Sequence, residues 1–295
     1  MPKTQKAESS ASRWRALVTS PLYRPCTVAT IASPTPYPEL NAVLAELVAG
    51  ARAVLEDSFC GAYLHGSFGS GDADEFSDVD FVVVTHDELT LDQQQGLQAL
   101  HRRLYALEAA WAQHLEGSYI PSAHLRHVDV SHRTFFYLNN GAQELVWDSH
   151  CNTAVVRWLL REHGVALAGP GPRTLVDPVS AGDLQQEAAT RVQDYADWAA
   201  ESTDAEPMDR WKQTYLVLTF CRLLFTLRNG RVASKREAAE WALGALDYEW
   251  AALIQQALDD RADPWDRVHQ PAPRELGNRT LQFAAYATAT AARLG

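Results

Sequence analysis

Residues 64–84 read LHGSFGSGDADEFSDVDFVVV, and this stretch predicts the architecture around it. An apolar strand runs into the turn Gly66-Ser67, and a second strand opens with Asp78 and Asp80. Glycine lets backbone amides approach a phosphate closely, and the Ser67 hydroxyl can donate a hydrogen bond to a phosphate oxygen. Residues two apart on a strand point to the same face, so we expect both aspartates to converge on one spot.

The chemistry that this pattern favours is a magnesium–nucleotide site. Hard oxygen ligands hold one or two Mg²⁺ ions, which bridge phosphate oxygens and stabilise an in-line displacement. The alternative is a polar loop of Gly, Ser and Asp with no chemical role. Two carboxylates at the start of an apolar strand favour the functional interpretation, because buried like charges are costly without a cation.

A third acidic residue is needed to take a proton from an attacking hydroxyl group. Glu116 lies at the start of LEGSYIP, which reads as the next strand, and it would lie beside the aspartates in a sheet. A carboxylate placed there can accept such a proton. The alternative, a strand-edge glutamate exposed to water, is common for this residue type and stays open at this point.

The composition narrows the class of protein. The 295 residues are 46% hydrophobic and include 26 basic and 37 acidic side chains, for a net charge of −11. This is a globular composition, and its acidity argues against DNA or RNA as the main partner. No apolar run is long enough to cross a membrane. The cysteines are widely spaced without a CxxC pair, which indicates reduced thiols and a cytoplasmic location: Cys26, Cys60, Cys151 and Cys221.

The periodicity predicts two domains after an irregular tail of residues 1–34. Strand signals and two amphipathic helices lie before Asp148, and only helical periods follow it. This order predicts an α+β fold, in which a domain with a small mixed sheet (35–148) precedes an all-helical domain (149–295). The predicted strands are 59–65, 81–84, 116–121, 134–138 and 144–147. The predicted helices are 36–56, 91–114, 152–163, 183–201, 208–228, 235–246, 249–260 and 275–294.

Two basic residues of the helical half are candidates for binding an anion. Arg222 lies in YLVLTFCRLLFTL, a helix that is apolar nearly all round, so it needs a partner or an anionic ligand. Lys235 follows Ser234, which has the position of an N-cap, and two cations in that first turn oppose the helix dipole. A bound triphosphate would resolve this conflict, while a solvated surface lysine is the alternative.

The spacing of Gly66, Ser67, Asp78 and Asp80 resembles the nucleotidyltransferase superfamily related to DNA polymerase beta. Its pattern is hydrophobic–Gly–Ser, about a dozen residues, and then Asp-x-Asp. The segments DSHCNTAVVRWLLREHGVALAGPGPRTLVDPVS and LVLTFCRLLFTLRNGRVASKREAAEWAL resemble the C-terminal helical domain of the aminoglycoside adenylyltransferases that act on streptomycin and spectinomycin. Together the resemblance covers roughly residues 40–290.

This resemblance implies an N-terminal nucleotidyltransferase domain and a helical C-terminal domain, with MgATP and the substrate between them. The residues that match the family's functional positions are Ser67 and Ser77 as nucleotide-binding serines, Asp78 and Asp80 as Mg²⁺ ligands, Glu116 as the catalytic base, and Arg222 and Lys235 as phosphate contacts. The implied reaction transfers AMP from ATP to a hydroxyl group of a small molecule and releases pyrophosphate.

The acceptor side departs from the family pattern. Where streptomycin-modifying members have an aspartate and a histidine that contact the drug, this sequence has Lys212 and Tyr215. A lysine repels a cationic aminoglycoside, so we expect spectinomycin, which carries fewer charges, or an unrelated hydroxyl compound as the acceptor. His150 and Asn152 also replace an acidic pattern near the nucleotide.

The sequence therefore predicts an ATP- and Mg²⁺-dependent adenylyltransferase of the aminoglycoside type. Its expected partners are ATP and a small-molecule hydroxyl acceptor, without nucleic acid or membrane, and the chain is expected to be a monomer. The alternative is a regulatory nucleotidyltransferase that adenylylates a protein partner. Such regulators commonly consist of the minimal domain alone, so the large helical half favours the small-molecule enzyme.

Overall fold

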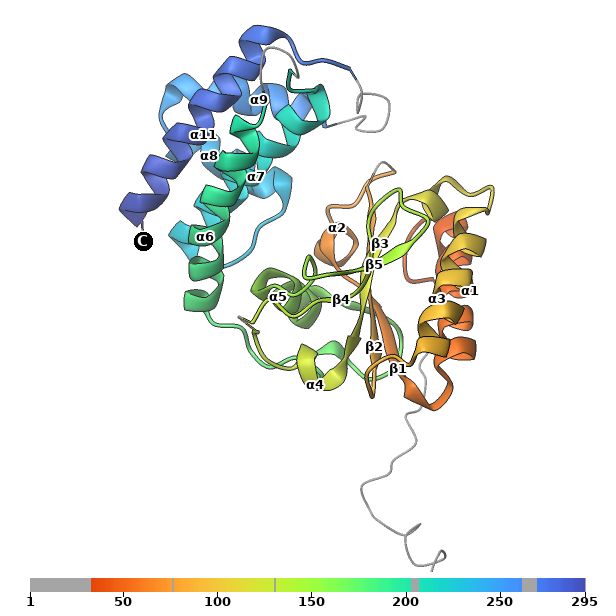
Figure 1. Cartoon of the computed structure of the whole chain (residues 1–295). Helices are drawn as coiled ribbons and strands as arrows, with labels where there is room; N and C mark the ends of the chain where they lie inside the picture. The colour runs from red at the N-terminus through yellow and green to blue at the C-terminus, as the bar shows by residue number, and fades with distance from the viewer. Residues whose placement is uncertain (1–32, 76, 130, 203–206, 262–269, 295) are drawn as a thin grey trace, which may run out of the picture.

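The computed structural model describes residues 33–75, 77–129, 131–202, 207–261 and 270–294. Figure 1 shows an N-terminal half in which helices flank a sheet, and a C-terminal half made of helices, from α6 to α11. The predicted α+β fold, with a mixed sheet followed by helices, is confirmed. The predicted tail lies outside the described residues as far as residue 32.

The sheet has six strands in the order β5-β4-β3-β2-β1-β6. Strands β2 and β3 pair in parallel, and every other neighbouring pair in this order is antiparallel. Strand β2 is buried along most of its length, as its unbroken apolar run predicts. The strands are β1 (Phe59–Leu64), β2 (Val79–Thr85), β3 (Leu115–Pro121), β4 (Phe135–Leu138), β5 (Leu145–Asp148) and β6 (Val165–Ala168).

Helices cover both faces of this sheet (Figure 1). Helices α1 and α3 pack on the face to which Val83 of β2 points, and α4 and α5 pack on the face of Val82 and Val84. Because side chains alternate along a strand, Asp80 shares the face of Val82. The helices of this half are α1 (Pro38–Leu55), α2 (Gly66–Ser70), α3 (Leu91–Tyr105), α4 (Ser122–Leu125) and α5 (Ala154–His163).

The sheet extends further along the chain than the sequence predicted. Strand β6 pairs antiparallel with β1, although no strand was expected after Asp148. Its run VALA has only four residues, too few to reveal a period, and the flanking glycines were the available signal. Since the sheet continues to Ala168, we propose that the domain boundary lies between Ala168 and Ala181, where α6 begins, instead of near Asp148.

The helix predicted for residues 91–114 is shorter than expected. It ends at Tyr105, and a separate 3-10 turn follows at Ala110–Gln113. Trp111 in this turn is buried and packs against the ring of Tyr37. The apolar residues at 110–113 continue the helical spacing of α3 in the sequence. In the structure they belong to the 3-10 turn, and they pack into the same hydrophobic core as α3.

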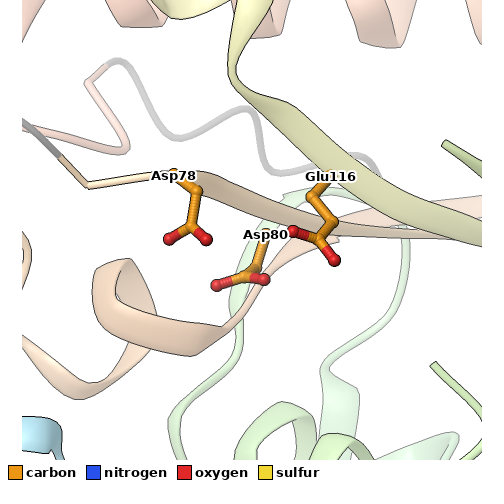
Figure 2. Close-up of side chains that lie close together, drawn as sticks. All are labelled: Asp78, Asp80 and Glu116. Carbon is orange, nitrogen blue, oxygen red and sulfur yellow. The ribbon is translucent and has the colours of Figure 1, made fainter. Parts of the chain in front are cut away.

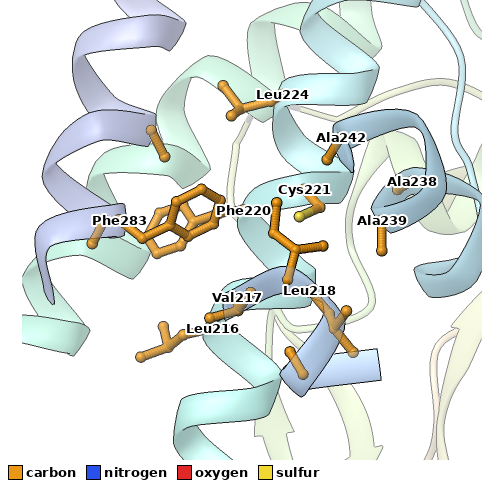
Figure 3. Close-up of a cluster of buried hydrophobic side chains, with 14 of the residues drawn as sticks. Leu216, Val217, Leu218, Phe220, Cys221, Leu224, Ala238, Ala239, Ala242 and Phe283 are labelled. Carbon is orange, nitrogen blue, oxygen red and sulfur yellow. The ribbon is translucent and has the colours of Figure 1, made fainter. Parts of the chain in front are cut away.

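The C-terminal half is built around α7 (Arg210–Asn229), which packs against α6, α8, α9 and α11. Figure 3 shows Phe220 of α7 beside Phe283 of α11, and the small alanines of α8 on the other side of α7. Because neighbouring helices cover most of α7, its sequence is apolar nearly all round. The other helices are α6 (Ala181–Ala200), α8 (Lys235–Ala245), α9 (Ala251–Asp260) and α11 (Arg274–Leu294).

Ion pairs join the helical half to the loop between β1 and β2. Arg236 of α8 lies 3.8 Å from Asp72, and Arg261, directly after α9, lies 3.5 Å from Asp74. Both aspartates belong to the loop that carries the Gly-Ser turn into β2. The start of α8 is therefore held close to the segment that the sequence singled out.

Two further expectations concern membranes and thiols. Among the described residues, no helix combines the length and hydropathy needed to cross a membrane. Among the described residues, Cys60, Cys151 and Cys221 form no disulfide, and Cys26 lies outside these residues.

Candidate active site

The carboxylates of Asp78, Asp80 and Glu116 lie together where β2 and β3 begin (Figure 2). Asp80 and Glu116 are register partners in the parallel pair, and Asp78 shares the face of Asp80. One oxygen from each carboxylate lies within 4.8 Å of the other two. Small adjustments would let a single cation contact more than one of them. The structure thus brings together the three carboxylates predicted from the sequence, while their chemical roles stay predictions.

The turn after β1 lies directly against these carboxylates. Gly66 has a φ of +58°, and a Cβ added here would overlap the Asp80 carboxylate, so only glycine fits. The Ser67 hydroxyl is buried without a hydrogen-bond partner among the described residues, which leaves it available to a ligand. The Ser77 hydroxyl instead donates to Asp74 Oδ1 at 3.0 Å and accepts from the Asp74 backbone N–H. Ser77 therefore stabilises the loop, and a nucleotide contact by this residue stays a prediction.

The cluster carries an excess of negative charge. Burial raises the pKa of Asp80 well above its usual range, and the charges of Asp78 and Glu116 raise it further. Lys235 and Arg222 lower this pKa, but they do not outweigh the other effects. A divalent cation would compensate the remaining charge with the oxygen ligands that it prefers. The residues present therefore fit a magnesium ion.

Both candidate phosphate contacts of the helical half lie near this cluster. Lys235 is the first residue of α8, and its Nζ lies 5.7 Å from the centroid of the Tyr215 ring. Burial lowers the pKa of Lys235, whereas the charge of Asp78 raises it. The Arg222 Nε donates to the Ala233 carbonyl at 3.2 Å, which anchors the guanidinium against the loop before α8. Lys235 is therefore not the fully solvated surface lysine of the alternative interpretation, and Arg222 has the partner that its apolar helix requires.

Glu116 is largely buried, with its side chain 14% exposed. Its Oε1 accepts a hydrogen bond from the Tyr137 hydroxyl at 2.5 Å and lies 3.2 Å from His150 Nε2. Burial by itself raises the pKa of Glu116, but the hydrogen bonds outweigh it, and the pKa lies below its ordinary value. Glu116 is therefore not the water-exposed residue of the alternative interpretation, and it is ionised near neutral pH, as a general base must be.

Lys212 and Tyr215 belong to an aromatic cluster between α6 and α7. The Lys212 Nζ lies 4.7 Å from the centroid of the Trp198 ring, within the range of a cation–π contact. The Tyr215 ring stacks on Trp211 with centroids 5.1 Å apart. Burial raises the pKa of Tyr215, and the charge of Glu116 contributes to this rise, which puts the ring within electrostatic reach of the carboxylates. Lys212 is thus held on a tryptophan face of α6.

Tyr137 was not predicted as part of this site, and His150 was noted only as a departure from the family pattern near the nucleotide. Tyr137 opposes Ser118 in the β3–β4 register, so its side chain shares the face of Glu116. The alternation of β4 could have found Tyr137. His150 lies in the turn after β5, and no local pattern places a loop residue against a carboxylate of another strand.

Two family models match the chain, in the order of its two halves. Residues 56–109 match the model described as "Polymerase beta, Nucleotidyltransferase". Residues 174–280 match the model described as "Aminoglycoside adenylyltransferase, C-terminal domain". The resemblance predicted from the sequence is confirmed for both regions.

Curated relatives match part of the chain. The aminoglycoside (3'') (9) adenylyltransferase of Klebsiella pneumoniae is 30% identical over 118 residues, which are 39% of this chain and 41% of that protein. The protein of the same name from Escherichia coli is 32% identical over 107 residues, or 35% of this chain and 36% of that protein. The matched regions therefore span less than half the length of these relatives.

A solved structure matches the fold over most of the chain. The crystal structure of spectinomycin adenyltransferase AAD(9) from Enterococcus faecialis with ATP and spectinomycin aligns with a TM-score of 0.64 and 16% sequence identity. The match covers 84% of this chain and 98% of that chain. At this level of identity the match establishes a shared fold.

Proposed function

We propose that this chain is an ATP- and Mg²⁺-dependent adenylyltransferase. It transfers AMP from ATP to a hydroxyl group of a small molecule and releases pyrophosphate. The observation that carries this proposal is the convergence of Asp78, Asp80 and Glu116 beside two basic side chains of the other half, Lys235 and Arg222. The nucleotidyltransferase and aminoglycoside adenylyltransferase family models support the same reaction.

Asp78 and Asp80 would hold the magnesium ion. Bound Mg²⁺ supplies Lewis-acid stabilisation of the charge on the reacting phosphate oxygens. Both aspartates would then stay ionised, because a bound cation offsets the burial and the like charges that now raise the pKa of Asp80.

Residues from both halves would bind the nucleotide phosphates. The Ser67 hydroxyl, which has no partner within the described ranges, can donate to a phosphate oxygen, and Gly66 lets the backbone come close. Lys235 and Arg222 would neutralise phosphate charge from the helical half. Because the two sets of residues lie on different halves, tight binding of ATP requires that the halves stay together.

Glu116 would be the general base. Its carboxylate takes the proton of the acceptor hydroxyl while the hydroxyl oxygen forms a bond to the α-phosphorus of ATP. The bond from that phosphorus to the α,β-bridging oxygen breaks, and pyrophosphate leaves with the electron pair. The largely buried position of Glu116 excludes bulk water, which limits hydrolysis as a competing reaction.

We place the acceptor beside Lys212 and Tyr215 of the aromatic cluster. The Lys212 ammonium already occupies the face of Trp198, a position that would otherwise attract a cationic group of the substrate. For a polycationic aminoglycoside such as streptomycin, the Trp198 ring is already occupied, and the Lys212 charge repels the cationic groups of the drug. Both effects weaken its binding. Spectinomycin, or another hydroxyl compound with little positive charge, is therefore the better acceptor.

The test is a pyrophosphate-release assay with MgATP and a panel that includes spectinomycin, streptomycin and neutral aminocyclitols. We expect turnover with at least one acceptor of low charge, and none after Asp80→Asn. Glu75→Gln is the matched control, because Glu75 is an exposed acid in the same loop, and this variant should keep full activity. Full turnover by Asp80→Asn would refute the assignment of the metal site.

A further inference from the structure

The hydrogen bonds of Glu116 are concentrated on one of its two oxygens. The Tyr137 hydroxyl donates to Oε1 at 2.5 Å, and His150 Nε2 lies 3.2 Å from the same atom. Within the described chain, Oε2 has no hydrogen-bond partner. We propose that Tyr137 and His150 are positioning residues, which hold Oε1 so that Oε2 is the atom that takes the proton of the acceptor hydroxyl. This inference rests on the proposed function, in which Glu116 is the base.

The direction of these hydrogen bonds follows from the charge state of Glu116. An ionised carboxylate has no proton to give, so the Tyr137 hydroxyl and His150 Nε2 must both be the donors. The Tyr137 hydroxyl also lies 3.0 Å from Asn139 Oδ1, but it has one proton, and the charged Glu116 oxygen is the stronger acceptor. Two donors on one oxygen restrict rotation of the carboxylate about its last bond.

The His150 ring is itself held in place. It stacks on the Tyr137 ring with centroids 5.1 Å apart and an interplanar angle of 27°. Its backbone N–H donates to Asp148 Oδ1 at 2.7 Å. Although the side chain is 57% exposed, the ring therefore has a defined position against Glu116.

A buried polar network anchors the turn that carries His150. Arg157 of α5 is 1% exposed and donates from Nη2 to Asn152 Oδ1 at 2.7 Å. Asn152 in turn donates to Asp129 Oδ2 at 3.1 Å and to the Arg133 carbonyl at 3.0 Å. Breaking one member of a buried network leaves its partners unpaired, so the network is costly to distort. The network therefore holds the turn in place, so that His150, although a loop residue, has a fixed position against the Glu116 carboxylate.

The site needs such positioning because its three carboxylates are so close. With oxygens within 4.8 Å of Asp78 and Asp80, an unrestrained Glu116 side chain could swing toward them and become another ligand of the cation. A carboxylate committed to a cation is a poorer proton acceptor. By holding Glu116 away from the cation, Tyr137 and His150 keep it available as a proton acceptor, while Asp78 and Asp80 bind the cation.

The test is a double-mutant cycle between His150 and Glu116, with kcat and the Kd for MgATP measured for each variant. We expect His150→Ala to lower kcat about 10- to 100-fold, the usual effect of removing a residue that orients a functional group, with Kd unchanged. His150→Gln, which restores an N–H donor, should recover most of this loss. In a Glu116→Gln background, His150→Ala should have no further effect, because the two residues act through one proton transfer.

The matched control is His127→Ala, which removes an exposed histidine that pairs with Asp177. It should leave kcat unchanged in both backgrounds. An equal fall in kcat when His150→Ala is made with and without Glu116→Gln would overturn the inference, since it would show that His150 acts elsewhere. A loss of MgATP affinity at full kcat would overturn it as well.

A second measurement separates this inference from the proposed function. The ring of His150 is faced by Glu116 and Asp148, which raise its pKa, and by Arg191, which lowers it. Titration of the His150 ring by NMR should therefore give a lower pKa in Glu116→Gln than in the wild type. An identical pKa in both proteins contradicts the contact, whether or not the enzyme turns over. An absence of AMP transfer by the wild type, in contrast, refutes the proposed function.

Discussion

Replacing Gly66 by alanine should disrupt the candidate metal site selectively. The residue has a left-handed backbone conformation with φ +58°, and an added Cβ would overlap the carboxylate of Asp80. The backbone conformation alone costs a non-glycine residue about 1–2 kcal/mol. The overlap has a second effect, because the Asp80 side chain must leave the position in which it faces Asp78 and Glu116.

The expected loss of MgATP affinity follows from the contact that Asp80 would make with the metal ion. An interaction with a charged partner contributes about 1.5–3 kcal/mol, so its loss should weaken MgATP binding by about 10- to 150-fold. Gly71 offers a matched control. It also has a positive φ, +77°, but an added Cβ would meet no atom within 4 Å. Gly71→Ala therefore carries a comparable backbone strain without the displacement of Asp80.

Isothermal titration of both variants with MgATP, and thermal unfolding of each, would test this reasoning. We expect similar decreases in Tm for the two variants, of about 2–4 °C per kcal/mol of strain. Only Gly66→Ala should lose affinity for MgATP. If Gly66→Ala binds MgATP as tightly as Gly71→Ala, the close approach of the turn to Asp80 has no functional meaning and the account of the site is wrong.

The remaining predictions concern the base, a phosphate contact, the acceptor and a buried histidine. Glu116→Gln should bind MgATP normally and transfer AMP about 10²–10⁴-fold more slowly in a single-turnover assay; a loss of affinity with intact chemistry would make it a ligand instead. Lys235→Met should weaken MgATP binding by about 10-fold or more in isothermal titration, whereas Arg228→Met, at an exposed position of α7, should not. Steady-state kinetics should show poor turnover of streptomycin by the wild type and a higher kcat/KM after Lys212→Asp; efficient wild-type turnover would defeat the exclusion argument. Burial lowers the pKa of His101 from 6.5 to about 3, so the folded protein binds fewer protons than the unfolded chain below pH 6.5. Its free energy of unfolding should therefore fall as the solution is acidified, by about 2 kcal/mol at about pH 5, and urea unfolding should show a flatter pH dependence for His101→Gln.

The carboxylate cluster was predictable because its geometry follows from short-range rules. Asp78 and Asp80 share a face by the period of two along a strand, and Glu116 opens the next strand that pairs in parallel. Lys235 and Arg222 were recognisable for another reason, since each is a cation in a place that disfavours an unpaired charge. These five residues meet in the folded chain although up to 157 positions separate them.

The sequence could not predict the contact between His150 and Glu116, nor the last strand of the sheet. The contact of His150 with Glu116 depends on a turn whose position is set by Asn152 and the buried Arg157, and such a network has no periodic signature. Strand β6 (Val165–Ala168) is short, and its apolar residues fit a helix as well as a strand. The position of Lys212 over Trp198 depends on how α6 packs on α7, which is also a matter of tertiary structure.

The central claim is that this site transfers AMP from ATP to an acceptor, and isotopic labelling tests it most directly. The wild type is incubated with Mg²⁺, spectinomycin or another acceptor of the panel, and ATP labelled either in the α- or in the γ-phosphate. The account predicts that the α-label joins the acceptor and that the γ-label leaves in pyrophosphate, with neither product formed by Asp80→Asn. Transfer of the γ-label to the acceptor, or no transfer of the α-label to any acceptor, would contradict it.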